Sequence, residues 1–204
     1  MADHDLHGNA PDQCPVALLL VDVINDLEFE GGDRLLPNAL PAAERLAALR
    51  RAARERDIPV IYANDNFGRW RSDFRHVVRH CLEDGVRGEP IARLLRPDDD
   101  DYFVLKPKHS AFFSTTLETL LAYLGARTLV LAGLTGDRCI LFTAVDAFMR
   151  DFRVLVPADC TASIDDEENR QAIGYLERVL GLDVSPSTAL DLDALVRDAG
   201  SAEA

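Results

Sequence analysis

The sequence predicts a three-layer α/β/α protein built on a doubly wound, Rossmann-like parallel sheet. Short apolar runs rich in Val, Ile and Leu alternate along the chain with segments whose apolar residues recur at helical spacing. The run VALLLV at 16–21 shows no polar alternation, which is typical of a strand buried on both faces. Strands separated by helices pair in parallel through right-handed crossovers, so helices are expected on both faces of the sheet.

The strands and helices are expected in strict alternation. The predicted strands are 16–21, 60–62, 102–105, 128–131 and 153–156. The first helix is predicted at 40–56 and ends before Pro59, which cannot continue it. The clearest later stripe stops at Gly125, a helix C-terminal signal, and consists of Leu117, Leu120, Leu121 and Leu124.

Length and charge limit the classes of function. With 204 residues, one domain is expected at 15–190, after a loose leader at 1–14 and before a tail at 191–204. The net charge of -13 would repel nucleic acid and anionic membranes, so neither is an expected partner. No apolar run approaches the ~20 residues of a membrane span and the first residues do not resemble a signal peptide, which favours a cytoplasmic protein.

Three reactive side chains stand just after predicted strands. Ligands of open α/β sheets bind beyond the carboxyl ends of the strands. Asp22 follows the first strand, Lys106 follows the third, and Cys139 lies in the turn between the fourth strand and its helix. These side chains meet at one edge of the sheet if their strands are neighbours.

The turn around Cys139 favours a reactive thiol. Gly133 and Gly136 permit a tight turn, and Asp137 is the expected N-cap of the helix, which puts Cys139 in the first helical turn. The helix dipole there is expected to lower the pKa of the thiol, and the free N–H groups to hold an oxyanion. A thiolate, a carboxylate and a lysine together make an acyl-transfer site.

Other readings of the reactive residues are weaker. Cys160 also follows a strand, but its helix begins only near Asp165, so we interpret it as structural. His76 and His80 have the i, i+4 spacing of a metal-binding pair, yet no third ligand is fixed by spacing. Neither GxGxxG nor GxxxxGK[ST] is present, so a nucleotide-binding oxidoreductase loses its main support.

The motifs around the three residues resemble the isochorismatase-like cysteine hydrolases, a superfamily that includes nicotinamidases and carbamoyl-amide hydrolases. The matching segments are LLLVDVINDL, VLKPKHSAFFSTTLETLLAYLGARTLVLAG and GLTGDRCILFTAVDAFMRDFRVLVPADC. The resemblance implies a six-stranded parallel sheet and a triad of Asp22, Lys106 rather than Lys108, and Cys139. It further implies a cis peptide at Leu134–Thr135 and an oxyanion hole made by the backbone N–H groups of Thr135 and Cys139.

The chain also departs from its relatives. Nicotinamidases carry an Asp-x-His metal cluster after the second strand, whereas here no histidine follows Asp65 two residues later. We therefore expect no metal and no other cofactor. Leu27 stands where many relatives have an aromatic residue, and Gly136 where many have threonine. The predicted substrate pocket is lined by residues near the strand ends, namely Leu27, Asn66, Phe67, Trp70, Phe112 and Phe113.

The resemblance implies a homo-oligomeric hydrolase that opens an amide, carbamoyl or lactam C–N bond of a small molecule through a thioester. True isochorismatases cleave a vinyl ether without the cysteine, so the presence of Cys139 argues against that reaction. NDNFGRW, which begins at Asn64, is similar to the streptothricin hydrolases, which open a lactam in a cationic antibiotic. The alternative is an inactive member that serves as a binding or scaffold protein.

Overall fold

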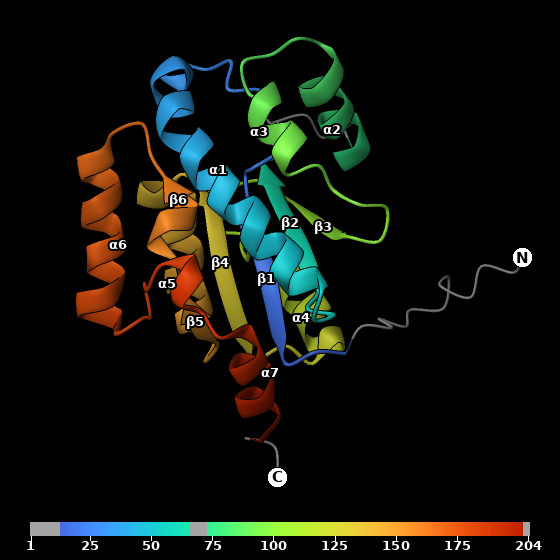
Figure 1. Ribbon diagram of the computed structural model, residues 1–204, viewed down its shortest axis with the longest axis vertical. Coiled ribbons are helices and arrows are strands. Elements are labelled where there is room, and N and C mark those ends of the chain that lie inside the picture. The colour runs from blue at the N-terminus through green and yellow to red at the C-terminus, as the bar shows by residue number, and fades with distance from the viewer. Residues whose placement is uncertain (1–12, 66–72, 202–204) are drawn as a thin grey trace, which may run out of the picture.

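A parallel sheet forms the centre of the computed structural model, which describes residues 13–65 and 73–201 (Figure 1). The strand order is β3-β2-β1-β4-β5, and a sixth strand, β6, also pairs with β4. All pairings are parallel, which confirms the predicted fold class. The strands are β1 (Val16–Val21), β2 (Val60–Asp65), β3 (Tyr102–Lys106), β4 (Thr128–Leu134), β5 (Arg153–Leu155) and β6 (Thr161–Ala162).

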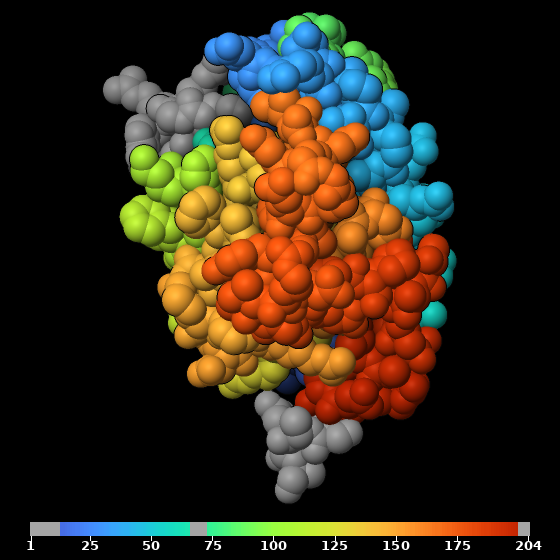
Figure 2. Space-filling view, turned by 90° about the vertical axis from the view of Figure 1, so that its left-hand side faces the viewer, coloured from blue at the N-terminus to red at the C-terminus, as the bar shows by residue number. Residues whose placement is uncertain are grey.

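Helices cover both faces of the sheet. One hydrophobic core lies between the sheet and α1 (Gly32–Arg54), α2 (Phe74–Glu83), α3 (Glu89–Leu94) and α7 (Leu192–Ser201). The second lies under α4 (Leu117–Leu124), α5 (Leu141–Phe148) and α6 (Asp166–Leu180). Figure 2 shows α6, in orange, between the yellow α5 region and the red C-terminal segment.

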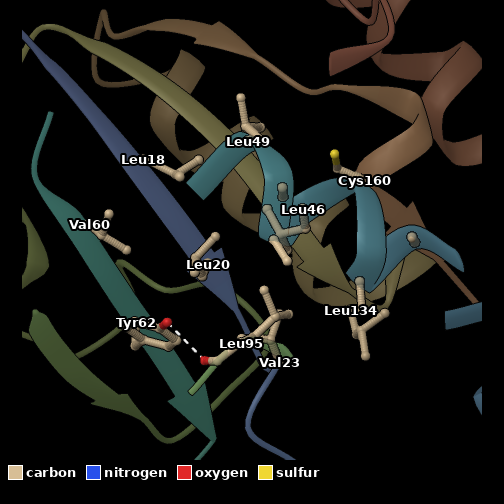
Figure 3. Packing of buried hydrophobic residues seen from close by; sticks show 14 of the residues in the cluster. Leu18, Leu20, Val23, Leu46, Leu49, Val60, Tyr62, Leu95, Leu134 and Cys160 are labelled. Carbon is tan, nitrogen blue, oxygen red and sulfur yellow. Dashed lines mark hydrogen bonds between the residues drawn. The ribbon is translucent and has the colours of Figure 1, made fainter. Parts of the chain in front are cut away.

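The central strand supplies both cores because its side chains alternate. Leu18 and Leu20 of β1 enter the first core, whereas Ala17, Leu19 and Val21 enter the second. Figure 3 shows Leu46 and Leu49 of α1 packed over β1. A continuous apolar run is therefore required here, as the sequence predicted.

The first helix differs from its predicted bounds. It begins at Gly32, eight residues before the predicted start, and contains both Pro37 and Pro41. Each proline removes one backbone donor, which is why the sequence favoured a later start. Leu35 and Ala39 are buried in the core, so apolar burial holds these first turns in place.

The packed part of the chain also exceeds the range 15–190. Cys14, assigned to the leader, is buried, and its N–H donates to the carbonyl of Leu124 at 2.9 Å. Leu192 and Leu195 of α7 are buried in the first core, although the sequence placed them in a tail. Among the described residues, no helix is both long and apolar enough to cross a membrane.

Within residues 13–65 and 73–201, three short helical turns complete the fold. The first, η2 (Gly136–Ile140), is a π-helical turn that joins β4 to α5. The others are η3 (Ala158–Cys160), which leads into β6, and η4 (Ser187–Ala189), which precedes α7. The two-residue strand β6 has too few residues for periodicity to detect, although the family resemblance implied a sixth strand.

We predict that Leu121→Ala lowers the free energy of unfolding by about 2 to 5 kcal/mol, because it opens a cavity under α4. Leu121 is fully buried. The matched control is Leu94→Ala, whose side chain is 40% exposed and which should cost less than about 1 kcal/mol. Urea unfolding followed by circular dichroism measures both changes, and equal losses would contradict this account of the core.

Candidate active site

Asp22 lies at the carboxyl end of the central strand. Its backbone adopts φ 52°, a left-handed conformation that non-glycine residues seldom adopt, and its N–H donates to the carbonyl of Ala63 at 2.9 Å. The Oδ1 atom accepts a hydrogen bond from the N–H of Asp65 at 2.7 Å. Two backbone contacts with β2 thus fix the direction of the carboxylate, and the residue as a whole is only 6% exposed.

Lys106 is the last residue of β3, and its side chain is fully buried. Strand β2 lies between β3 and β1, so the two residues are not on neighbouring strands. The long side chain spans this gap, and Nζ lies 2.7 Å from Oδ2 of Asp22. Lys108, by contrast, is exposed and contributes its carbonyl, which accepts a hydrogen bond from Lys106 Nζ at 3.2 Å.

Cys139 lies in η2, directly after β4, the neighbour of β1. Lys106 Nζ donates to Sγ at 3.5 Å, and the Asp22 carboxylate forms a hydrogen bond with the thiol. The structure therefore brings Asp22, Lys106 and Cys139 together from three strand ends. Thr135, not Asp137, is the N-cap residue of η2, so the predicted cap was wrong by two positions.

The close approach of β1 and β4 depends on a glycine. Gly133 has φ +128°, and a Cβ atom there would lie 2.1 Å from the carbonyl oxygen of Val21. At Gly136 a Cβ would lie 1.9 Å from Oδ1 of Asn169. A threonine at this second position would therefore require Asn169 to move.

Burial dominates the electrostatics of the three groups. It raises the pKa of Cys139 to about 12, the nearby Asp22 carboxylate raises it too, and Lys106 opposes both effects. The sequence predicted a pKa lowered by the helix dipole, and this prediction was wrong because the thiol is shielded from water and, secondly, lies beside the Asp22 carboxylate. Burial and the Asp22 carboxylate thus favour the protonated form of the thiol, which lies beside a proton acceptor.

The carboxylate and the ammonium group respond to burial differently. Burial raises the pKa of Asp22 above its usual value, although Lys106 and the hydrogen bonds from Cys139 and Asp65 lower it. For Lys106, burial acts to lower the pKa, but the Asp22 carboxylate, which lies next to it and accepts its hydrogen bond, is the main opposing cause and leaves the pKa raised. Asp22 is therefore a stronger base than an exposed aspartate, and Lys106 keeps its charge.

The segment before Cys139 has the expected unusual backbone. The Leu134–Thr135 peptide bond is cis. The carbonyl of Thr135 accepts hydrogen bonds from the N–H groups of Arg138 at 3.2 Å and Ile140 at 3.1 Å, on either side of Cys139. The carbonyl of Thr135 thus binds the N–H groups of the residues before and after Cys139, and neither of these bonds uses the N–H of Cys139 itself.

A cavity of about 500 Å³ opens over the sulfur. Leu27 lines it, as predicted, and so does His109, which the sequence analysis missed although it stands three residues after Lys106. Its wall carries more charge than the sequence analysis expected, from Arg34, Asp65, Asp137, Arg138, Asp165 and Glu168. A small polar molecule fits such a space.

The remaining predicted pocket residues have other positions. Phe112 is 5% exposed and packs against Phe152 at 5.8 Å between ring centroids, so it belongs to the core and not to the pocket. Phe113 is 53% exposed and does not line the cavity. The other three predicted residues, Asn66, Phe67 and Trp70, lie outside the described residues.

The rival sites do not have the features of a reactive centre. Cys160 is buried in η3, where burial raises the pKa of its thiol to about 12. Both ring nitrogens of His80 are engaged by carboxylates, Nδ1 with Asp84 at 2.7 Å and Nε2 with Asp26 at 3.3 Å. His80 is therefore not directed toward a shared metal with His76.

Known proteins resemble this chain in sequence. The chain is 40% identical over 169 residues to an uncharacterized isochorismatase family protein, YaaI, of Bacillus subtilis, which covers 83% of this chain and 92% of that protein. It is 32% identical over 168 residues to a probable inactive nicotinamidase of Arabidopsis thaliana, over 74% of this chain and 82% of that protein.

A solved structure shares the fold. The crystal structure of N-carbamoylsarcosine amidase from Thermoplasma acidophilum superposes with a TM-score of 0.64 at 28% identity, over 86% of this chain and 98% of that one. The isochorismatase domain family matches residues 16–185, which include all three converging side chains. The chain therefore belongs to the isochorismatase family.

Proposed function

We propose that this protein is a hydrolase that cleaves an amide, carbamoyl or lactam C–N bond of a small molecule through a thioester on Cys139. The proposal rests on one observation, the contact of a buried Asp22–Lys106 ion pair with the Cys139 sulfur. The similarity to an amidase that acts on N-carbamoylsarcosine supports C–N cleavage.

The first half-reaction uses the protonated thiol. Asp22 takes the proton as Sγ attacks the carbonyl carbon, and then gives it to the leaving nitrogen. The backbone N–H groups of Thr135 and Cys139 hold the oxyanion of the tetrahedral intermediate. Lys106 stays charged throughout, so it stabilises Asp22 when ionised and the sulfur as negative charge develops.

The substrate is small and polar in this proposal. A cavity of about 500 Å³ with both acidic and basic walls accepts a molecule of a few functional groups. Four of its wall residues other than Asp22 are acidic and two are arginines, which is compatible with a cationic substrate such as the lactam antibiotics cleaved by streptothricin hydrolases.

We predict that Cys139→Ala lowers the release of ammonia or amine by about 1000-fold or more across a panel of small amides and carbamoyl compounds, because the nucleophile is lost. The control is Cys160→Ala, which removes the rival thiol and should change the rate by less than about threefold. Coupled ammonia detection measures both variants. Unchanged turnover by Cys139→Ala would contradict the mechanism.

We also predict the pH dependence of kcat/KM. Asp22 must be ionised to accept the thiol proton, so activity is present at high pH and is lost as pH falls through the raised pKa of Asp22. The acid limb should therefore be centred above 3.8, the ordinary aspartate value. A pH–rate profile that stays flat down to that value would contradict the role of Asp22.

The alternative function is a binding module without catalytic activity. The raised pKa of Cys139 and the similarity to a probable inactive nicotinamidase both favour it. The two functions predict different rates of reaction between the Cys139 thiol and an electrophile. Only an active site transfers the thiol proton to Asp22 as the sulfur attacks.

We predict that iodoacetamide at neutral pH labels Cys139 faster than it labels glutathione, a free thiol. Burial makes the resting thiolate scarce, so fast labelling requires Asp22 to take the proton as the sulfur attacks. Peptide mass spectrometry separates Cys139 from the three other cysteines, which are buried. Labelling slower than that of glutathione would favour the binding module.

A further inference from the structure

An exposed histidine, His109, contacts the sulfur of Cys139, in addition to the buried ion pair. Nδ1 of His109 lies 3.6 Å from Sγ, about as close as Nζ of Lys106 at 3.5 Å. Asp22 and Lys106 are buried, whereas His109 is exposed and lines the cavity. The sulfur thus has one buried acid-base partner and one that water reaches directly.

The fold holds His109 in this place. The loop that carries it is tied to α5 by the hydroxyl of Ser110, which donates to Oδ2 of Asp146 at 2.5 Å. The N–H of Ala111 donates to the hydroxyl of Thr143 at 3.0 Å. The ring stacks on Phe142 at 5.7 Å between centroids and an interplanar angle of 24°. These contacts come from one helix, so the imidazole and the sulfur are positioned by neighbouring parts of the same helical segment.

Asp22 is more buried than His109, although both line the cavity. Its Oδ2 is bound by Lys106 Nζ at 2.7 Å, and its Oδ1 by the N–H of Asp65 at 2.7 Å. In the first half-reaction the thiol proton is already in contact with Asp22, so no further acceptor is needed. In the second half-reaction a water molecule must enter from the cavity, where His109 is the exposed imidazole.

We infer that His109 is a fourth catalytic residue, which activates the water that hydrolyses the Cys139 thioester; this inference rests on the proposed function. With its own proton on Nε2, the neutral ring accepts a proton from water at Nδ1 as the water oxygen bonds to the acyl carbon. The intermediate then collapses, the bond between Sγ and carbon breaks, and Nδ1 returns the proton to Sγ. The products are the free acid and the Cys139 thiol, and no other reactant is consumed.

The test separates acylation from deacylation with p-nitrophenyl acetate, an activated ester that acylates thiols. Stopped-flow absorbance of wild type, His109→Gln and His109→Phe gives the burst of p-nitrophenolate and the steady rate that follows. Phenylalanine preserves the stacking on Phe142 without the nitrogen. Both variants should show a burst of one equivalent and a steady rate lower by about 100-fold or more. The acetyl group on Cys139 should then be visible by intact mass spectrometry.

Hydroxylamine distinguishes a proton acceptor from a merely structural residue, because it attacks thioesters without help from a base. It should restore the turnover of both variants to within about threefold of wild type treated in the same way. The matched control, His76→Gln, changes an exposed histidine on α2 and should deacylate like wild type.

The contradicting outcomes distinguish a failure of the role of His109 from a failure of the proposed function. Deacylation at the wild-type rate in either His109 variant, or slow deacylation that hydroxylamine does not restore, would overturn the role of His109 while the cysteine hydrolase stands. A wild-type protein that forms no acetyl-Cys139, and behaves like Cys139→Ala, would overturn the proposed function and with it this inference.

Discussion

The ion pair between Asp22 and Lys106 is the interaction on which the rest of the site depends. Its two charged atoms lie 2.7 Å apart, and their side chains are 8% and 0% exposed. A charge this deeply buried is costly unless a partner compensates it, and removal of one partner from a buried pair typically costs about 3 to 5 kcal/mol. The carboxyl ends of β1 and β3 must therefore keep their relative positions, so that each buried charge retains its partner.

The sheet satisfies this requirement through its middle strand. Asp65 of β2 stands in register with Lys106, and its N–H holds the other oxygen of Asp22. On the opposite side, Gly133 allows β4 to approach β1, which sets η2 and the Cys139 sulfur against the same pair. One buried carboxylate is thus fixed from both neighbouring strands, and reactive groups from three strand ends meet without a long loop.

The same burial shapes the chemistry that we propose. A thiol beside a carboxylate holds its proton, so nucleophilic attack and proton transfer to Asp22 must be coupled. The exposed His109 faces the sulfur from the cavity, where leaving groups depart and water arrives. In this proposal each half-reaction has its own proton acceptor, the buried Asp22 in the first and the exposed His109 in the second.

The sequence by itself determined the layered fold, since uninterrupted apolar runs and helical stripes are readable from neighbouring residues. It also singled out Asp22, Lys106 and Cys139, because position after a strand and the family motifs are local properties. Only the tertiary structure decided the direction in which the pKa of Cys139 is shifted, the place of Phe112 in the core and the contact of His109 with the sulfur. Each of these depends on burial and on groups brought together from distant segments, which no local pattern records. The strand order was likewise decided by the tertiary structure. Strand β2 lies between β1 and β3, and the long side chain of Lys106 spans it to reach Asp22, a contact that exists only once the sheet has formed.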